Sequence, residues 1–130
     1  MPSGKVTYRQ RDILLTRFPF SDLIGSKIRP VLVLSNDVYN GRHSDLLICA
    51  VTSSPRPHEY AASLATGDLE QGILKVESKV RADAIISIEQ RIVIKRIGRV
   101  ANPKYQQIIT LVQKLISAAV GSRTGAVSRR

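Results

Sequence analysis

Hydrophobic positions along this chain fall into short runs separated by turn residues, followed by one longer segment with a helical period. The clearest short runs span residues 12–18, 31–34 and 46–51. Runs of this length, bounded by Gly, Pro, Asn and Asp, are typical of strands. The unbroken apolar run at 46–51 predicts a central strand covered on both faces. Turn-forming residues within 19–29 and 35–41 predict a long loop and a turn, with Pro30 opening the second strand.

The middle of the chain has weaker strand patterns. Short strands are expected at 60–64 and 73–76, on either side of a turn at 66–68. Residues 79–84 alternate polar and apolar side chains, which predicts a half-exposed strand that continues to residue 88. Another β-branched run lies within residues 91–100.

The last segment predicts an amphipathic helix over residues 103–120. Asn102 is a favourable N-cap, Pro103 suits the first helical position, and Gly121 is a typical stop. Apolar residues recur between these ends at three- and four-residue steps. Short strands followed by one helix predict a bent β-barrel, or a pair of sheets, with the helix packed on it. Because the informative residues of the helix are apolar, we look for chemistry in the loops that leave the strands.

Length and composition narrow the class of protein. The chain has 130 residues and a mass of 14.3 kDa, which fits one domain, with a polar leader at 1–11 and a flexible basic tail at 121–130. No apolar run approaches the length of a membrane span, and the leader lacks the apolar core of a signal peptide. The single cysteine, Cys49, excludes an internal disulfide framework and a multi-thiolate zinc site. We therefore expect a cytoplasmic protein without membrane association.

Charge points to a polyanionic partner. The chain carries 20 Lys and Arg against 10 Asp and Glu, a formal net charge of +10. An excess of this size favours nucleic acid, an acidic protein or an anionic surface as partner. Aromatic residues are few and tryptophan is absent, so binding of single strands mainly by aromatic stacking is not expected.

Candidate chemistry is sparse. The aspartates are scattered without metal-ligand spacing, so we expect neither a metal nor another cofactor. His43 and His58 both lie in polar stretches, either as solvated loop residues or as the acid and base of a two-histidine ribonuclease. Cys49 lies in the most apolar strand, where a small buried side chain is the better interpretation than a nucleophile. Arg29 stands beside Pro30, where a guanidinium can contact two phosphate oxygens, or is one solvated arginine among many. Thr52 ends the central strand and can present a hydroxyl to the same ligand.

Several segments, taken together, resemble the PemK/MazF family of toxin endoribonucleases. The resemblance spans roughly residues 12–120 and lies in 12–22 (DILLTRFPFSD), 25–35 (GSKIRPVLVLS), 48–53 (ICAVTS), 79–83 (KVRAD) and 95–100 (KRIGRV). It implies an SH3-like barrel of the CcdB/MazF type, mainly β with one C-terminal helix. It also implies a homodimer, inhibition of growth through cleavage of single-stranded mRNA at short motifs, and neutralisation by a cognate acidic antitoxin. Cleavage would need no metal and would leave a 2′,3′-cyclic phosphate and a 5′-hydroxyl.

The resemblance also assigns residues. The catalytic arginine and threonine of the family map onto Arg29 and Thr52. Residues expected to contact RNA are Lys27, Ser53, Lys79 and Arg81. The chain departs from the family at position 11, where arginine replaces the usual glycine, which implies a different entry turn. In the loop before Arg29 it offers Asp22 instead of a glutamate.

Two other functions stay open at this point. Proteins that poison DNA gyrase share this barrel but need a protein-binding end on the C-terminal helix and have no use for an arginine–threonine pair around a phosphate. A non-catalytic RNA-binding barrel would require charge alone. The Arg29 and Thr52 segments favour the endoribonuclease.

Overall fold

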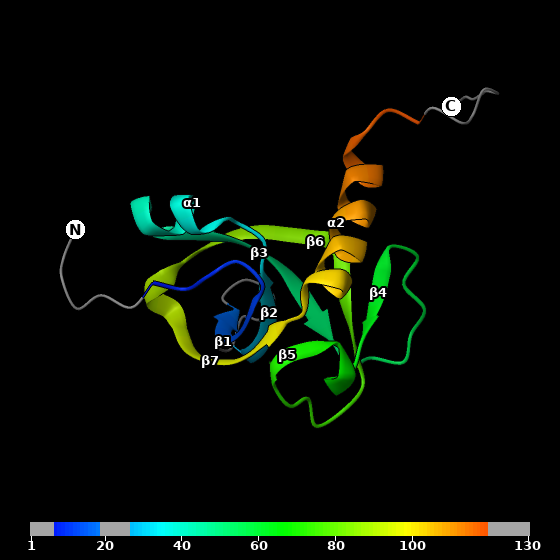
Figure 1. The fold of residues 1–130 in the computed structure, drawn as a ribbon, viewed down its shortest axis with the longest axis horizontal. Helices are drawn as coiled ribbons and strands as arrows, with labels where there is room; N and C mark the ends of the chain where they lie inside the picture. Colours follow the sequence, from blue (N-terminus) through cyan, green and yellow to red (C-terminus); the bar gives the residue numbers. More distant parts are fainter. Residues whose placement is uncertain (1–6, 19–26, 120–130) are drawn as a thin grey trace.

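A computed structural model describes residues 7–18 and 27–119 as a strongly curled sheet with a long helix against one end (Figure 1). The described part contains β1 (Asp12–Phe18), β2 (Lys27–Val33), α1 (Asp37–Arg42), β3 (Asp45–Thr52), β4 (Ala61–Leu64), β5 (Leu69–Gly72), β6 (Ser78–Glu89), β7 (Val93–Val100) and α2 (Asn102–Ile116), with 3₁₀ turns at Thr66–Asp68 and Gln90–Ile92. The expected class, mainly β with a C-terminal helix, is confirmed. Residues 1–6 of the predicted leader and the whole of the predicted tail lie outside the described residues.

The seven strands form one antiparallel sheet in the order β4-β6-β3-β2-β1-β7-β5. Successive residues of a strand point to opposite faces, and neighbours such as Ile13 and Leu14 belong to two different buried clusters. The first cluster includes Tyr105 and Ile108 of α2, which packs against β4 and β6. The second lies on the other face of the sheet. Each face therefore has its own core.

The strand predictions at 12–18, 46–51, 60–64, 79–88 and 91–100 correspond to β1, β3, β4, β6 and β7. The prediction for the start of β2 is wrong, because the strand begins at Lys27 and Pro30 lies inside it. β2 pairs with β1 from Lys27 to Leu32 but with β3 only from Val31 onward. Pro30 thus lies where the strand has one neighbour, a position that tolerates a missing backbone donor.

The expected turn at 35–41 is instead mostly the short helix α1. The Asn36 side chain accepts a hydrogen bond from the Tyr39 N–H at 2.9 Å and caps this helix. Asn40 is buried and donates to the backbone oxygens of Tyr8 and Ser35 at 3.1 and 3.0 Å. The cap is a local contact, whereas the bond to Tyr8 joins distant parts of the chain and helps to stabilise so short a helix.

Residues 73–76 do not form the predicted strand. The strand in this region is β5, which directly follows the 3₁₀ turn and pairs with β7, and residues 73–76 continue from it as irregular chain. Gly72 has a φ of +91°, which turns the chain away from the sheet after this strand. The expected strand is therefore displaced by four residues.

The C-terminal helix is shorter than predicted. Ala101 is its N-cap and Asn102 its first residue, and the Tyr105 hydroxyl donates to the backbone oxygen of Leu34 at 3.0 Å. The helix ends at Ile116, whereas Gly121, the predicted stop, lies outside the described residues. Only the first half of the apolar face is buried, since Ile116 is 77% exposed.

Arg11 enters β1 with a φ of +79°, the left-handed conformation that glycine adopts without strain. Its N–H donates to the Val33 oxygen and its own oxygen accepts from the Val100 N–H, at 3.0 and 2.9 Å. The arginine side chain donates to the Val100 oxygen at 2.8 Å and to Glu70 at 3.0 Å. Arginine therefore makes a turn that is better suited to glycine, and its side chain adds contacts there.

Candidate functional site

The two predicted catalytic residues both line one cavity, which lies where β2 and β3 separate. The last paired residues of these strands in this direction are Val31 and Ala50. Arg29 and Thr52 each lie two residues beyond this last pair, where the strands are no longer paired with one another. Both residues line a cavity of about 550 Å³ that opens at this point. The fold thus brings to one cavity two residues that lie 23 positions apart in the sequence.

Arg29 is available for an anionic ligand. It lies in the exposed first half of β2, and its guanidinium has no hydrogen-bond or ion-pair partner among the described residues. A guanidinium presents a planar fork of donors that matches two oxygens of a phosphate. Thr52 is half-buried, and its hydroxyl oxygen accepts a hydrogen bond from the Ser54 N–H at 3.1 Å. This contact uses an oxygen lone pair and leaves the hydroxyl proton for donation to a ligand.

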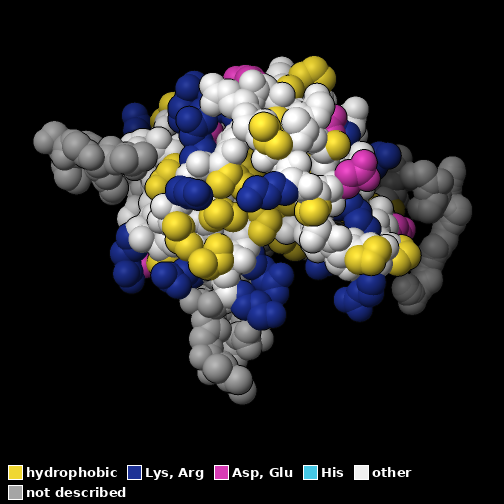
Figure 2. Space-filling model, turned by 90° about the horizontal axis from the view of Figure 1, so that it is seen from below, with side chains coloured by type: hydrophobic (Ala, Val, Ile, Leu, Met, Phe, Trp, Pro, Cys, Tyr) yellow, Lys and Arg dark blue, Asp and Glu magenta, His cyan; other side chains and the backbone are white. Residues whose placement is uncertain are grey.

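The cavity combines apolar walls with a cationic rim. Its apolar lining comes from Leu15, Ile28, Pro30, Val51, Ile73, Leu74, Val76 and Ile97, and its polar lining includes Ser53 and Ser78. Lys75 and Lys95 join Arg29 as the cations of the lining. Seen from the side of β5 and β7, Lys and Arg side chains lie among exposed hydrophobic ones, whereas acidic side chains show in only a few places (Figure 2). The site is thus suited to a ligand that carries both negative charge and apolar surface.

The structure brings some of the predicted RNA-contacting residues to this cavity and leaves others at its flanks. Ser53 lines the cavity directly. Lys79 pairs with Thr52 across β3 and β6, and its ammonium donates to the backbone oxygen of Arg56. Arg81 lies two residues further along β6 and forms two hydrogen bonds with Asp83, at 3.1 and 3.2 Å. Lys27 is exposed at the start of β2, two residues before Arg29.

The Arg81–Asp83 pair changes the charge that this strand presents. The hydrogen bond from Arg81 is the main cause that lowers the pKa of the Asp83 carboxyl below its usual value, with smaller effects from the charges of Arg81 and His58. Asp83 therefore stays ionised and neutralises Arg81 at neutral pH. Of the cations near Thr52, Lys79 consequently presents more net charge than Arg81.

The sequence did not indicate that Lys95 or the segment 73–76, which contains Lys75, belongs to the site. Lys95 stands in one of the segments that carry the family resemblance, and this was the one available signal for it. Lys75 was expected in a strand, and no local pattern marks it. Asp22, in the loop before β2, lies outside the described residues.

The other candidate chemistries are not assembled. The backbone oxygen of His43 accepts from the Gln90 side chain, whereas His58 lies near Asp83. Gln90 and Asp83 are seven residues apart along extended chain, a distance of about 20 Å. The two histidines are therefore too far apart to act on one phosphate. Cys49 is fully buried, and burial raises the pKa of its thiol to about 12, which keeps it protonated and inert.

The described residues contain no group of three or more His, Cys, Asp or Glu side chains arranged to hold a metal ion. In the same part of the chain, no helix has the length and apolar character needed to span a membrane.

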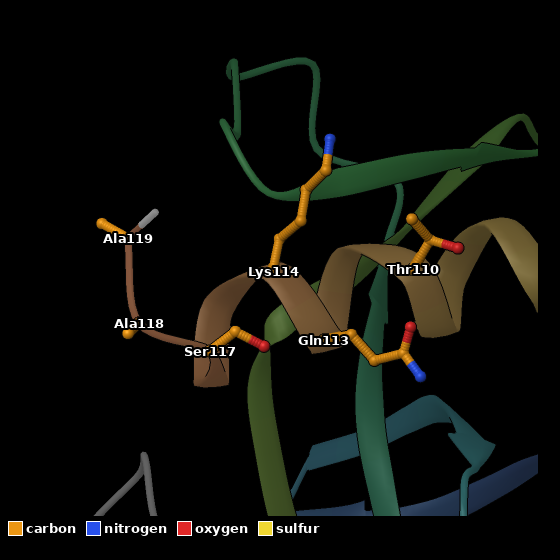
Figure 3. Close-up of a pocket in the computed structure, with 6 residues that line it drawn as sticks. All are labelled: Thr110, Gln113, Lys114, Ser117, Ala118 and Ala119. Carbon is orange, nitrogen blue, oxygen red and sulfur yellow. The ribbon is translucent and has the colours of Figure 1, made fainter. Parts of the chain in front are cut away.

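A second hollow lies at the end of α2. It has a volume of about 380 Å³ and is lined by Thr110, Gln113, Lys114, Ser117, Ala118 and Ala119 (Figure 3). The lining consists of short or polar side chains and one lysine, and it contains none of the predicted site residues. The apolar residues Leu115 and Ile116 of the same helix end are exposed.

Comparison with protein-family models gives a match over residues 9–116 to the model described as "PemK-like, MazF-like toxin of type II toxin-antitoxin system". A comparison with curated protein sequences gives no match.

Solved structures show the same fold at low sequence identity. A chain of a MazE–MazF crystal structure from Deinococcus radiodurans has a TM-score of 0.72 and 19% identity, covering 88% of this chain and 100% of that one. An endoribonuclease in complex with its cognate antitoxin, from a mycobacterial species, has a TM-score of 0.69 and 18% identity, covering 87% and 98%. The Mycobacterium tuberculosis toxin MazF-mt6 has a TM-score of 0.65 and 18% identity, covering 80% and 94%. The expected MazF-type fold is thereby confirmed.

Proposed function

Because this chain belongs to the PemK-like, MazF-like toxins of type II toxin–antitoxin systems, we propose that it is an endoribonuclease that cleaves single-stranded RNA without a metal ion. The observation that carries this proposal is that Arg29 and Thr52 line one cavity, which has a cationic rim. The names of two similar structures, which describe an endoribonuclease with its antitoxin and a MazF toxin, agree with the proposal.

The proposed reaction is an attack within the RNA strand. The ribose 2′-oxygen forms a bond to the adjacent phosphorus while the bond from phosphorus to the 5′-oxygen of the next nucleotide breaks. The 2′-hydroxyl loses a proton and the leaving 5′-oxygen gains one, so the products are a 2′,3′-cyclic phosphate and a 5′-hydroxyl. Arg29 spans two equatorial oxygens of the phosphorane, where negative charge accumulates in the transition state. Thr52 donates a hydrogen bond from its hydroxyl to a phosphate oxygen or positions the 2′-hydroxyl.

Neighbouring residues bind the RNA strand on either side of this phosphate. Lys27, Ser53, Lys79 and Arg81 contact the backbone, together with Lys75 and Lys95 on the rim. A net charge of +10 supplies a salt-dependent attraction that holds RNA of any sequence. Cleavage of mRNA at short motifs would inhibit translation and growth, and this substrate places the action of the protein in the cytoplasm.

We further propose a cognate acidic antitoxin and a homodimeric toxin. An acidic antitoxin segment that folds on binding would use the same basic surface as RNA, so the two ligands would compete. Dimerisation would cover exposed parts of a small barrel. Saturating antitoxin should abolish RNA binding, and light scattering of the toxin alone at micromolar concentration should give the mass of a dimer.

One experiment tests the proposed activity against its alternatives. The purified protein is incubated with a long single-stranded RNA in EDTA, and both ends of each product are mapped. We expect cleavage at a limited set of sites with 2′,3′-cyclic phosphate and 5′-hydroxyl ends. Binding without cleavage would indicate the non-catalytic barrel. No binding, together with inhibition of DNA gyrase, would indicate a gyrase poison acting through the exposed apolar end of α2.

A further inference from the structure

One side of the cavity is formed by irregular chain that exposes large apolar side chains. Residues Ile73, Leu74, Lys75 and Val76, which we call the site wall, all line the cavity that contains Arg29 and Thr52. Ile73 is 73% exposed and Val76 is 59% exposed. Exposed aliphatic side chains beside a charged site favour a ligand with an apolar face.

The site wall is held in place at both its start and its middle. At its start, Gly72 lies so close to β7 that an added Cβ would be 2.4 Å from the Ile97 oxygen and 2.7 Å from the Gly98 Cα. At its middle, the Thr66 hydroxyl accepts from the Leu74 N–H at 3.0 Å and donates to the Leu74 oxygen at 3.1 Å. The Leu74 side chain packs against the core cluster that contains Cys49. The exposed side chains of the wall are therefore carried by an anchored backbone.

Size and charge identify the kind of ligand that suits this cavity. A volume of about 550 Å³ is within the range of roughly 300–1,000 Å³ that is usual for sites of small ligands. On β2, Ile28 is also 54% exposed and lines the cavity with the wall. The cations Arg29, Lys75 and Lys95 on the lining match a phosphate, and the aliphatic side chains match the flat faces of a base. One nucleotide of a single strand presents both features.

We propose that the site wall and Ile28 hold the base of a nucleotide next to the cleaved phosphate, and that the wall thereby contributes to the choice of cleavage sequence. The proposal rests on the proposed endoribonuclease activity and extends it. Because the base and the phosphate occupy one cavity with Arg29 and Thr52, the nucleotide involved directly adjoins the cleaved bond. With few aromatic residues in the chain, aliphatic contact takes the place of stacking.

The test uses a variant with Ile73→Ala and Val76→Ala, together with a matched control. Val38 of α1 is a similarly exposed valine, at 63%, and lies at the opposite end of β3 from Thr52, so Val38→Ala is the control. Wild type and both variants cleave a single-stranded RNA library with randomised sequence in EDTA, and the product ends are sequenced. We expect the wall variant to lose preference at one position beside the cleaved bond and to cleave the preferred site more than about tenfold more slowly, since the two substitutions remove five carbons and each lost buried CH₂ weakens binding several-fold. The control should match the wild type.

The outcomes separate this inference from the proposed function. Absence of cleavage by the wild type would remove the proposed function itself. Cleavage by the wild type with an unchanged sequence preference in the wall variant would overturn the inference alone. A uniform loss of rate at all sites would also overturn it, because it would assign the wall a structural role only.

Thr66 supplies a second test as a positioning residue for the wall. Thr66→Val removes both hydrogen bonds to Leu74 and is expected to change the preference at the same nucleotide position as the wall variant. Thr66→Ser keeps the hydroxyl and should restore the wild-type preference. If Thr66→Val kept the wild-type preference, Thr66 would have no part in base selection.

Discussion

Arg11 gives the sharpest test of the fold, because its backbone and its side chain have opposite effects on stability. A residue other than glycine in the left-handed region costs roughly 1–2 kcal/mol. The Arg11 side chain offsets this cost through its hydrogen bonds to the Val100 oxygen and to Glu70. A charge-assisted hydrogen bond contributes about 1.5–3 kcal/mol. The pair with Glu70 adds little, since the Glu70 side chain is 42% exposed and its charge is screened by solvent.

Two variants separate the effects. Arg11→Ala removes the side-chain contacts and keeps the strain, so it should lower the free energy of unfolding by about 2 kcal/mol. Arg11→Gly removes the same contacts and relieves the strain, so it should be about 1 kcal/mol more stable than the alanine variant. The free energy of unfolding is measured by urea denaturation, with Gln106 on the exposed side of α2 as the control position. There the order should reverse, and glycine should be about 1 kcal/mol less stable than alanine. An alanine variant at position 11 that equals or exceeds the glycine variant would refute strain at Arg11.

Three further predictions concern packing, pH and charge. Gly98→Ala should lower the free energy of unfolding, measured in urea, by about 1–3 kcal/mol, because the added Cβ would lie 2.8 Å from a backbone oxygen of β5. Gly41 has open space around an added Cβ, so the control Gly41→Ala should not lower the free energy of unfolding. Burial raises the pKa of Cys49 to about 12 in the folded state. The contribution of this thiol to the free energy of unfolding should therefore be constant below about pH 9 and fall as pH rises towards 12. In urea denaturation over this pH range, Cys49→Ala should lose less stability than the wild type. Asp83→Asn should free Arg81 and strengthen RNA binding, and the salt dependence of binding should steepen by about one counterion; unchanged binding would contradict a role for Arg81 at the RNA backbone.

The sequence predicted the elements whose stability comes from local pattern. The apolar run at residues 12–18 gives β1 with its observed bounds, and the two-residue alternation after position 79 gives most of β6. The sequence did not predict α1, because Asn40 is held by Tyr8 and by the side chain of Gln90, which donates to its backbone oxygen at 2.9 Å. These contacts join distant parts of the chain, and the local sequence shows only the Asn36 cap.

The candidate site shows the same division. Arg29 and Thr52 were selected from segments that resemble a toxin family, and pairing of the neighbouring parts of β2 and β3 brings both residues to one cavity. The sequence predicted a strand for the site wall, because Ile73 and Val76 are β-branched residues, which favour strands. The close packing of Gly72 on Gly98 ends β5 before them and turns the chain over the cavity. This packing depends on the pairing of β5 with β7 and is not visible in the sequence of either segment.

The central claim is that Arg29 and Thr52 carry RNA cleavage, and single-turnover cleavage of a synthetic RNA in EDTA tests it most directly. Arg29→Lys keeps the charge and loses the planar fork, and Thr52→Val keeps the volume and loses the hydroxyl. Each should lower the rate by about 10²–10³, the usual effect of removing one preorganised donor, while RNA binding and the unfolding transition stay close to those of the wild type. Arg42→Lys, an exposed substitution on α1, should keep the wild-type rate. Wild-type rates for both Arg29→Lys and Thr52→Val would contradict the assignment of the active site to this cavity.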